Sequence, residues 1–285
     1  MLQDLEFGRL ENEYRDISPR DDDAVLCFQD SSILLHRDAD DCLQLPDYGR
    51  AAVWAQGWES WQAEKFHYVF CLHGRNYFVF MGEAGQGEVP FAFESVRMLR
   101  QLTSKDVCYA IMTGWHLYSW YRSNRFCGRC GSKTVHDEKE RMLRCPECGN
   151  MIFPRINPAV IVAVTNGDRL LLTKYAGRAY TRYALIAGFT EIGETAEQTV
   201  AREVMEEVGL RVKNIRYYKS QPWGIDGNLL LGYYCDLDGD DAIRIDENEL
   251  SMALWYPRND LPAKDDGISL TREMVRVFEE GKEPK

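Results

Sequence analysis

Four of the nine cysteines in this 285-residue chain form two Cys-X-X-Cys pairs, which constrain its fold more than any other feature. Cys127 pairs with Cys130 and Cys145 with Cys148, and 14 residues separate the two pairs. Two intervening residues let both sulfurs of a pair reach one ion, and a glycine after each pair allows the chain to turn. The spacing predicts a four-thiolate zinc site. Because protein ligands fill all four positions, this zinc would stabilise the fold and leave no place for a reacting water.

Other interpretations of the cysteines explain less. Four unrelated buried cysteines have no reason to fall in two pairs at this spacing, and a redox dithiol needs only one pair. The other five cysteines are scattered, at positions 27, 42, 71, 108 and 235. This pattern fits a reducing compartment and one metal site better than a framework of disulfides.

A second constraint is the acidic segment between Gly188 and Leu210. Thr195 and Gln198 have the pattern of a capping box, and Gly209 is typical of a left-handed helix end. These signals predict a helix of about 13 residues over 196–208. Its position in the chain matters because most of the acidic residues of the segment fall inside it.

The charges of the predicted helix gather on one side. At roughly 100° per residue, Glu203, Glu206 and Glu207 share a narrow face, which we expect to be exposed, beside an apolar stripe of valines. Three such carboxylates would raise one another's pKa and oppose folding unless hard cations such as magnesium or manganese neutralise them. Taken alone, however, three glutamates are more often a solvated helix surface.

The whole 23-residue segment 188–210 resembles the Nudix box: a glycine, five residues, a glutamate, seven residues and REUXEEXGU, with U apolar. The match at every specified position favours metal binding over a solvated surface. The resemblance implies a loop, helix and loop within an α/β/α sandwich that holds divalent metal against a diphosphate. It implies that Glu203 and Glu207 are metal ligands, that Glu206 is a further ligand or activates water, and that Arg202 orients them by ion pairing.

A cysteine ribbon just before this box, followed by Ser220-Gln221-Pro222-Trp223, is similar to the NADH pyrophosphatase branch of the Nudix family. The similarity covers about residues 95–265. In that branch the SQPW element usually continues as PFPxS, whereas here residues 224–228 read GIDGN, and Phe153 stands where tyrosine is common. Two glycines in five residues predict a freer loop, and therefore weaker discrimination among dinucleotides.

The same resemblance assigns further candidate site residues. It implies that Phe189 and Trp223 stack on a nucleotide base, that Glu249 is a late metal ligand, and that Ala187 offers its carbonyl to the metal. Arg97 and Glu140 are weaker candidates, because a lone charged residue is as often simply a surface residue. The candidate substrate contacts are Phe189, Gln221, Pro222, Trp223, Phe153, Glu140 and Arg97.

The length of the chain predicts more than one domain. We expect an α+β fold with a β-rich domain over 1–122 that ends in a helix, a zinc ribbon over 123–152, and the α/β/α Nudix domain over 153–285. In the first domain, strands are predicted at 24–28, 32–36 and 67–81, and a helix from the caps Thr103 and Ser104 to Arg122. In the last domain, strands are predicted at 159–164, 169–173, 215–219 and 229–235, and a final helix at about 270–280.

Composition limits the partners of the chain. The formal net charge of -11 argues against tight binding of duplex nucleic acid without a local basic patch, and it means that a phosphate substrate needs a bridging cation. The start of the sequence lacks a basic and apolar leader, and no stretch has the roughly 18 apolar residues of a membrane span. A cytoplasmic location without membrane contact is expected.

These features together predict an enzyme. Metal-activated water would attack a phosphorus of NADH or NAD and give nicotinamide mononucleotide and AMP. Another nucleoside diphosphate derivative, such as ADP-ribose or capped RNA, is the alternative substrate. The resemblance also implies a homodimer with shared sites. A different class of hypothesis, a nucleic-acid-binding ribbon joined to a ligand-sensing Nudix domain, is disfavoured by the intact box and the acidic charge.

Overall fold

The computed structural model describes the chain except for residues 6–7, 39–41, 56–61, 63–64, 84–90, 100–102, 178–180 and 263–265. The described residues form two compact units. One contains Met1, 156–223 and 228–285, and the other contains 2–155 and 224–227. The ribbon therefore groups with the β-rich part by its contacts, while the two predicted domain boundaries, after residues 122 and 152, stay predictions.

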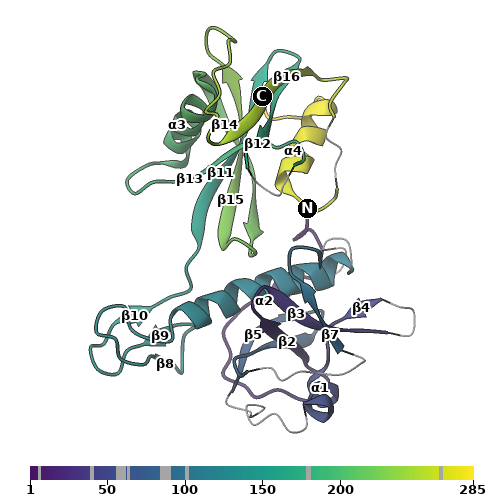
Figure 1. Cartoon of the computed structure of the whole chain (residues 1–285), viewed down its shortest axis with the longest axis vertical. Coiled ribbons are helices and arrows are strands. Elements are labelled where there is room, and N and C mark those ends of the chain that lie inside the picture. The colour runs from purple at the N-terminus through teal and green to yellow at the C-terminus, as the bar shows by residue number, and fades with distance from the viewer. Residues whose placement is uncertain are drawn as a thin grey trace. The chain divides into compact units, whose positions relative to one another are not determined.

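A seven-stranded sheet forms the β-rich part, in the order β1-β5-β6-β2-β3-β4 with β7 paired to β3 (Figure 1). β2 runs parallel to β6, and β5 and β6 form an antiparallel hairpin. The predicted apolar run at 67–81 is split into these two strands because His73 and Gly74 adopt positive φ in the turn between them. The strands are β1 Leu10–Glu11, β2 Ala24–Gln29, β3 Ser32–Arg37, β4 Leu43–Gln44, β5 Phe66–Leu72, β6 Arg75–Phe80 and β7 Phe91–Ser95.

Two helices accompany this sheet, α1 (Tyr48–Trp54) and α2 (Lys105–Ser123). The Ser104 side chain accepts a hydrogen bond from the main chain of Val107 and caps α2, as the sequence predicts. The hydroxyl of Tyr118 on α2 donates to the carbonyl of Phe28 on β2. The central strand β2 is thus covered by α2, which explains why its sequence is an almost continuous apolar run.

A small three-stranded sheet forms the ribbon, in the order β10-β9-β8. Its strands are β8 (Val135–His136), β9 (Leu143–Arg144) and β10 (Met151–Ile152). One face of this sheet is buried, since Leu143 and Ile152 pack with Trp120 and Tyr121 of α2. The turns of the ribbon carry the two cysteine pairs.

The other unit is built on a mixed sheet in the order β14-β15-β11-β12-β16, with β13 paired to β11. β11 and β15 are parallel, and the remaining pairs are antiparallel. Both helices of this unit pack on this sheet. Its strands are β11 Asn157–Asn166, β12 Arg169–Tyr175, β13 Ile186–Phe189, β14 Val212–Trp223, β15 Asn228–Leu237 and β16 Leu250–Pro257.

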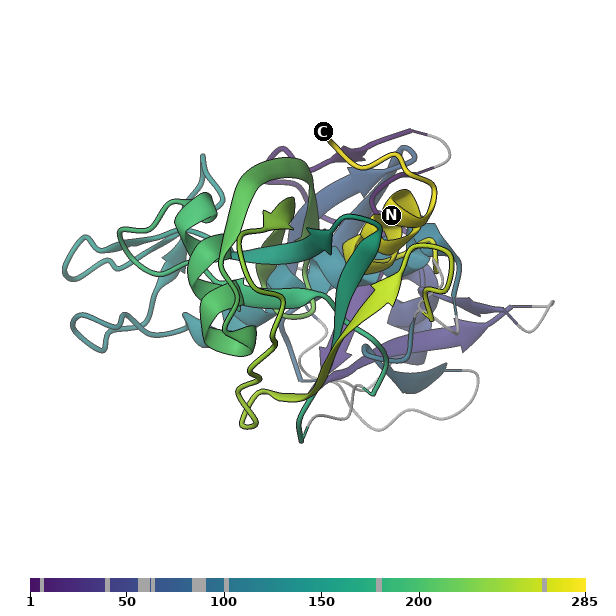
Figure 2. The same cartoon turned by 90° about the horizontal axis from the view of Figure 1, so that it is seen from above.

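Helices α3 (Ala196–Val208) and α4 (Leu270–Glu279) lie on opposite sides of this sheet, as Figures 1 and 2 show. The valines of α3 pack with Val160, Val162 and Val164 of β11, whereas α4 packs with the alternate residues Ile161 and Ala163. The period of two along a strand therefore divides the core between the two helices. This arrangement confirms the predicted α/β/α sandwich and the bounds of α3.

None of the helices in the described part of the chain is long and apolar enough to cross a membrane.

Candidate functional site

The loop before α3 and the first turn of that helix are fixed by hydrogen bonds within the acidic segment. The Thr195 hydroxyl accepts from the main-chain N–H of Gln198 at 3.2 Å, and the Gln198 side chain accepts from the N–H of Thr195 at 2.8 Å. At the other end, Gly209 has a φ of 68° and caps the helix. The capping box and the left-handed stop thus set which residues of α3 face the sheet.

Arg202 is the centre of a network of charges on α3. Its guanidinium donates to both carboxylate oxygens of Glu194 at 2.7 and 2.9 Å, to Glu203 at 2.7 Å and to Glu206 at 2.9 Å. It also donates to the carbonyl of Phe189 at 2.8 Å. One rigid fork therefore ties the loop to the helix and holds two of the three predicted carboxylates.

Glu194 belongs to this network, although it is absent from the predicted site residues. It also accepts from the main chain of Glu191 and from the hydroxyl of Thr199. Hydrogen bonds from Arg202 are the main cause that lowers the pKa of Glu194 to about 2. The sequence did contain a signal for Glu194, because the box specifies a glutamate at this position, just before the seven unspecified residues.

The expectation that the carboxylate face is exposed was wrong for two of its three glutamates. Glu203 is 9% exposed and Glu207 is 2% exposed, whereas Glu206 is exposed. The reason is the approach of α3 to β13: a Cβ placed on Gly188 would lie 1.9 Å from the carboxyl carbon of Glu203. Only glycine at this position leaves room for the Glu203 carboxylate.

Burial also changes the chemistry of these groups. Loss of water contact raises the pKa of Glu203, which Arg202 opposes and the nearby charges of Glu206 and Glu249 reinforce. A buried carboxylate with acidic neighbours is costly unless positive charge balances it. The donor set therefore fits a divalent cation that prefers oxygen ligands.

The two remaining predicted metal ligands lie on neighbouring elements. Ala187 is in β13 opposite Ile161, one residue before the glycine that accommodates Glu203. Glu249 is exposed just before β16, and its charge acts on Glu203. Their coordination of a metal stays a prediction.

The predicted stacking residues are accessible in this unit. Phe189 is 55% exposed at the end of β13, and Pro222 is exposed beside the half-buried Trp223 at the end of β14. Aromatic rings at strand ends with this exposure can accept a base. Contact with a nucleotide stays a prediction for all three.

Gln221 has a structural task in this conformation. It is fully buried, its side-chain oxygen accepts from the N–H of Leu270 at 2.7 Å, and its side-chain nitrogen donates to the carbonyl of Ile268 at 2.8 Å. The amide therefore connects β14 to the start of α4. Its predicted contact with substrate stays a prediction, and no local pattern in the sequence indicated these hydrogen bonds.

Three other predicted contacts belong to the second unit. Phe153 is 52% exposed after β10, Glu140 is exposed in the loop before β9, and Arg97 forms an ion pair with Asp226 at 3.5 Å. Within the same unit, a Cβ on Gly224 would lie 2.1 Å from the carbonyl oxygen of Met112. Gly224 thus permits a close approach of main chains, and the weaker discrimination expected from the glycines of this loop stays a prediction.

The four cysteines meet in the ribbon. All four sulfurs lie within 4.8 Å of one another, with Cys127 and Cys148 3.7 Å apart and Cys130 and Cys145 3.4 Å apart. The main-chain N–H of Arg129 is the main cause that lowers the pKa of Cys127 to about 6. Thiolates supported by main-chain N–H groups suit a tetrahedral zinc ion, so the residues present fit the predicted metal.

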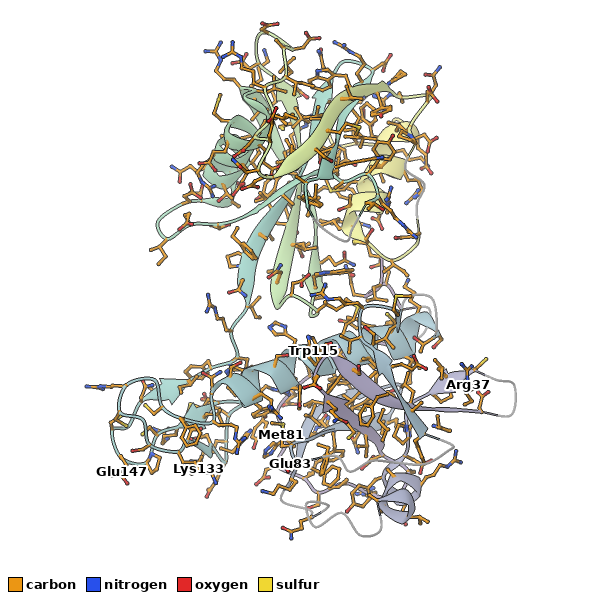
Figure 3. The ribbon with its side chains drawn as sticks, viewed as in Figure 1. Arg37, Met81, Glu83, Trp115, Lys133 and Glu147 are labelled. Carbon is orange, nitrogen blue, oxygen red and sulfur yellow. The ribbon has the colours of Figure 1, made fainter. Side chains whose placement is uncertain are left out.

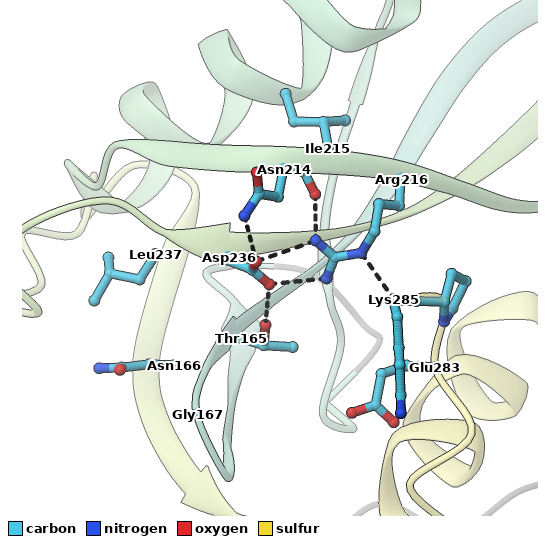
Figure 4. A pocket seen from close by; sticks show the side chains of 11 residues that line it. Thr165, Asn166, Gly167, Asn214, Ile215, Arg216, Asp236, Leu237, Glu283 and Lys285 are labelled. Carbon is cyan, nitrogen blue, oxygen red and sulfur yellow. Dashed lines mark hydrogen bonds and ion pairs between the residues drawn. The ribbon is translucent and has the colours of Figure 1, made fainter.

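A cavity of about 660 Å³ lies elsewhere on the sandwich (Figure 4). It is lined at the ends of β11 and β15 and the start of β14, where Arg216 donates to Asp236 at 2.8 Å and Asp236 also accepts from Thr165. On β11, Thr165 is at the opposite end from Val160, which pairs with Gly188. No predicted site residue lines this cavity, and its central charges are paired with each other.

Comparison with known proteins agrees with this geometry. Residues 155–278 match the NUDIX domain, and residues 122–153 match the NADH pyrophosphatase zinc ribbon domain. The chain belongs to the Nudix hydrolase family. Within that family it carries the zinc ribbon of the NADH pyrophosphatases, as the sequence resemblance predicted.

Named relatives support the same grouping. A protein called NAD-capped RNA hydrolase NudC from Enterobacter sp. (strain 638) is 41% identical over 162 residues, which cover 57% of this chain and 62% of that protein. One with the same name from Pectobacterium atrosepticum is 38% identical over 179 residues, 62% of this chain and 68% of that protein. The chain thus matches about two thirds of the length of these relatives. A solved NUDIX hydrolase from Nitrosomonas europaea is 23% identical, with a TM-score of 0.47 over 55% of this chain and 91% of that one.

Proposed function

We propose that this protein hydrolyses the diphosphate bond of NADH or NAD and releases nicotinamide mononucleotide and AMP. The observation that carries the proposal is the pair of buried carboxylates, Glu203 and Glu207, on a helix with an intact Nudix box. Burial of two acidic groups on one helix face is unfavourable for a purely structural surface and favourable for binding cations. The choice of a dinucleotide as substrate rests on the names of the relatives and on the match to the NADH pyrophosphatase zinc ribbon.

In this mechanism Glu203, Glu206, Glu207, Glu249 and the carbonyl of Ala187 would hold the metal. Bound magnesium or manganese supplies positive charge for the diphosphate and lowers the pKa of a water molecule. The protein contributes the geometry, because the Arg202 fork fixes Glu203 and Glu206 before the substrate arrives.

Substrate binding in this proposal depends on the exposed rings. Phe189 and Trp223 would stack on a base, with Pro222 beside them, while Phe153, Glu140, Arg97 and Gln221 are the further candidate contacts. We also propose a homodimer whose two copies share their sites, as the resemblance to the NADH pyrophosphatase branch implies. We also propose a reducing compartment such as the cytoplasm, because two cysteine pairs with zinc-ribbon spacing and five scattered cysteines are not the pattern of a disulfide framework.

NAD-capped RNA is the second candidate substrate, because the two relatives are named as hydrolases of it. The chemistry is the same, since the cap contains the diphosphate of NAD. ADP-ribose is a third candidate that the same carboxylates would serve. A module that only binds or senses ligands is disfavoured because all box positions are present.

A comparison of specificity constants tests the proposal. We would measure kcat/KM for NADH, NAD, ADP-ribose and diadenosine diphosphate with magnesium and with manganese. We expect cleavage of NADH, with modest preference over the other adenine dinucleotides. Absence of NADH cleavage with cleavage of ADP-ribose would reject the NADH assignment and leave the Nudix assignment in place.

A further inference from the structure

The ribbon differs in charge from the rest of the chain. Residues 122–155 contain eight lysines and arginines and four aspartates and glutamates, although the whole chain has a net charge of -11. A zinc ion bound to four thiolates carries about two negative charges, which leaves this segment positive. An acidic chain needs a local basic region to bind a polyanion, and the ribbon is such a region.

The register of the small sheet gathers part of this charge on one face. Met151 and Val135 both pair with Arg144, so these three side chains form a row across the sheet. Lys133, two residues before Val135, forms a bridge with Phe126 and extends this row, and Phe153 follows Met151 by two. We call Phe126, Lys133, Val135, Arg144, Met151 and Phe153 the outer ribbon face.

The outer ribbon face is open to solvent. Phe126, Val135, Met151 and Phe153 are 50 to 60% exposed, and Lys133 and Arg144 are exposed as well. Figure 3 shows the labelled Lys133 side chain at the edge of the ribbon. The alternate residues of the strands, by contrast, pack on α2. Exposed apolar side chains that share one face with cationic side chains are typical of an interaction surface.

The combination of rings and cations fits single-stranded nucleic acid. Bases stack on exposed aromatic rings, while lysine and arginine neutralise phosphates. The only carboxylate ion-paired to this face in the described structure is Asp137, which contacts Arg144 at 3.3 Å and leaves that side chain 44% exposed. A second copy of the chain fits less well, because the centres of protein interfaces are depleted of lysine, and Lys133 lies between Phe126 and Val135.

We propose that the outer ribbon face binds single-stranded RNA through stacking on Phe126 and phosphate contacts with Lys133 and Arg144. This inference rests on the second candidate substrate of the proposed function, since an RNA chain is what distinguishes a capped transcript from a free dinucleotide. It assigns to the ribbon a surface for the polynucleotide in addition to its zinc site.

Binding is best measured apart from hydrolysis. The zinc-loaded full chain, without added magnesium or manganese, is titrated into a fluorescent ten-nucleotide single-stranded RNA with a 5′-phosphate, and anisotropy gives Kd over a range of salt. We expect Phe126→Ala to weaken binding about tenfold. The double variant Lys133→Ala/Arg144→Ala should lower the slope of log K against log salt by about 1.4, since each phosphate contact contributes about 0.7.

Lys139→Ala is the matched control, because it removes the same charge from an exposed position of the ribbon outside the outer ribbon face. It should leave Kd almost unchanged, and zinc content and Tm should match the wild type in every variant. The Phe126→Ala and Lys133→Ala proteins should also cleave NADH at the wild-type rate.

Four outcomes would overturn the inference. Wild-type protein that does not bind the RNA, or that binds a duplex of the same sequence equally well, contradicts the assignment even if NADH is cleaved. An equal loss of RNA affinity in Lys139→Ala would indicate general electrostatics. If Phe126→Ala converts a dimer to a monomer in sedimentation while RNA affinity is unchanged, the face belongs to a second copy. RNA binding without NADH cleavage would instead reject the proposed dinucleotide activity.

Discussion

The ribbon and helix α3 both carry predicted metal ligands, yet they hold them differently. The four sulfurs of the ribbon all lie within 4.8 Å of one another. Among the residues that the structure describes, the glutamates of α3 form no group this tight, and two of them are engaged by Arg202. A closed ligand set suits a structural ion, whereas carboxylates held by a cationic side chain keep space for substrate and water.

The first prediction concerns the ribbon, where we expect the largest effect. Cys127→Ser should lose zinc and lower the stability of the ribbon by several kcal/mol, because the ion replaces the core that so small a sheet lacks. Metal analysis and thermal unfolding would show the change. Cys42→Ser, at an exposed cysteine outside the ribbon, is the control. An unchanged Tm with no zinc in the wild type would refute the assignment.

The second prediction concerns the open set of ligands. Glu207→Gln should lower kcat on the order of a hundredfold or more, because it removes a metal-binding charge. The substitution is nearly isosteric and removes a buried charge, so Tm should stay the same or rise. Glu197→Gln, on the exposed first turn of α3, should behave like the wild type. Near wild-type turnover of Glu207→Gln at saturating magnesium would remove the main support for the mechanism.

A smaller effect is expected from the residue that holds the carboxylates. Arg202→Lys keeps the positive charge but loses the fork that reaches both oxygens of Glu194. Kcat should fall about tenfold, and the magnesium concentration needed for half-maximal rate should rise by a similar factor. Kinetics over a magnesium series would measure both. If Arg202→Lys is as inactive as Glu207→Gln, then Arg202 itself contacts the substrate.

The smallest effect should appear in the pH dependence of stability. Arg202 lowers the pKa of Glu194 to about 2, from an ordinary value of 4.5. A lowered folded-state pKa means that the stabilisation is complete above pH 4.5 and disappears as the pH falls toward 2. The difference in Tm between the wild type and Glu194→Gln should therefore be constant near neutral pH and shrink over that acidic range. A difference that disappears already at pH 6 would contradict the role given to this pair.

Local signals in the sequence were sufficient for much of the fold and for the cluster of four cysteines. The capping box and Gly209 predicted the bounds of α3, and the cysteine spacing predicted the ribbon. Strands β2, β3, β11 and β12 were also found, because their apolar runs end at turn residues. In each of these places the determining residues are close together in the sequence.

What the sequence could not predict depends on contacts between distant residues. The burial of Glu203 requires β13 to bring Gly188 against α3, and β13 is too short to give a clear periodic pattern. Helix α1 and strand β16 were also missed. The task of Gln221 could not be foreseen for the same reason, because its partner Leu270 lies 49 residues further along the chain.

The Gln221 amide makes the start of α4 a remote reporter on the strand that ends in Trp223. The Leu270 N–H is protected by an acceptor on β14, not by a turn of its own helix. Any displacement of β14 large enough to move Gln221 would release this hydrogen to exchange with solvent. Amide exchange at Leu270, measured with and without dinucleotide, would therefore show whether β14 becomes more or less rigid when substrate binds. The measurement needs no label near the substrate.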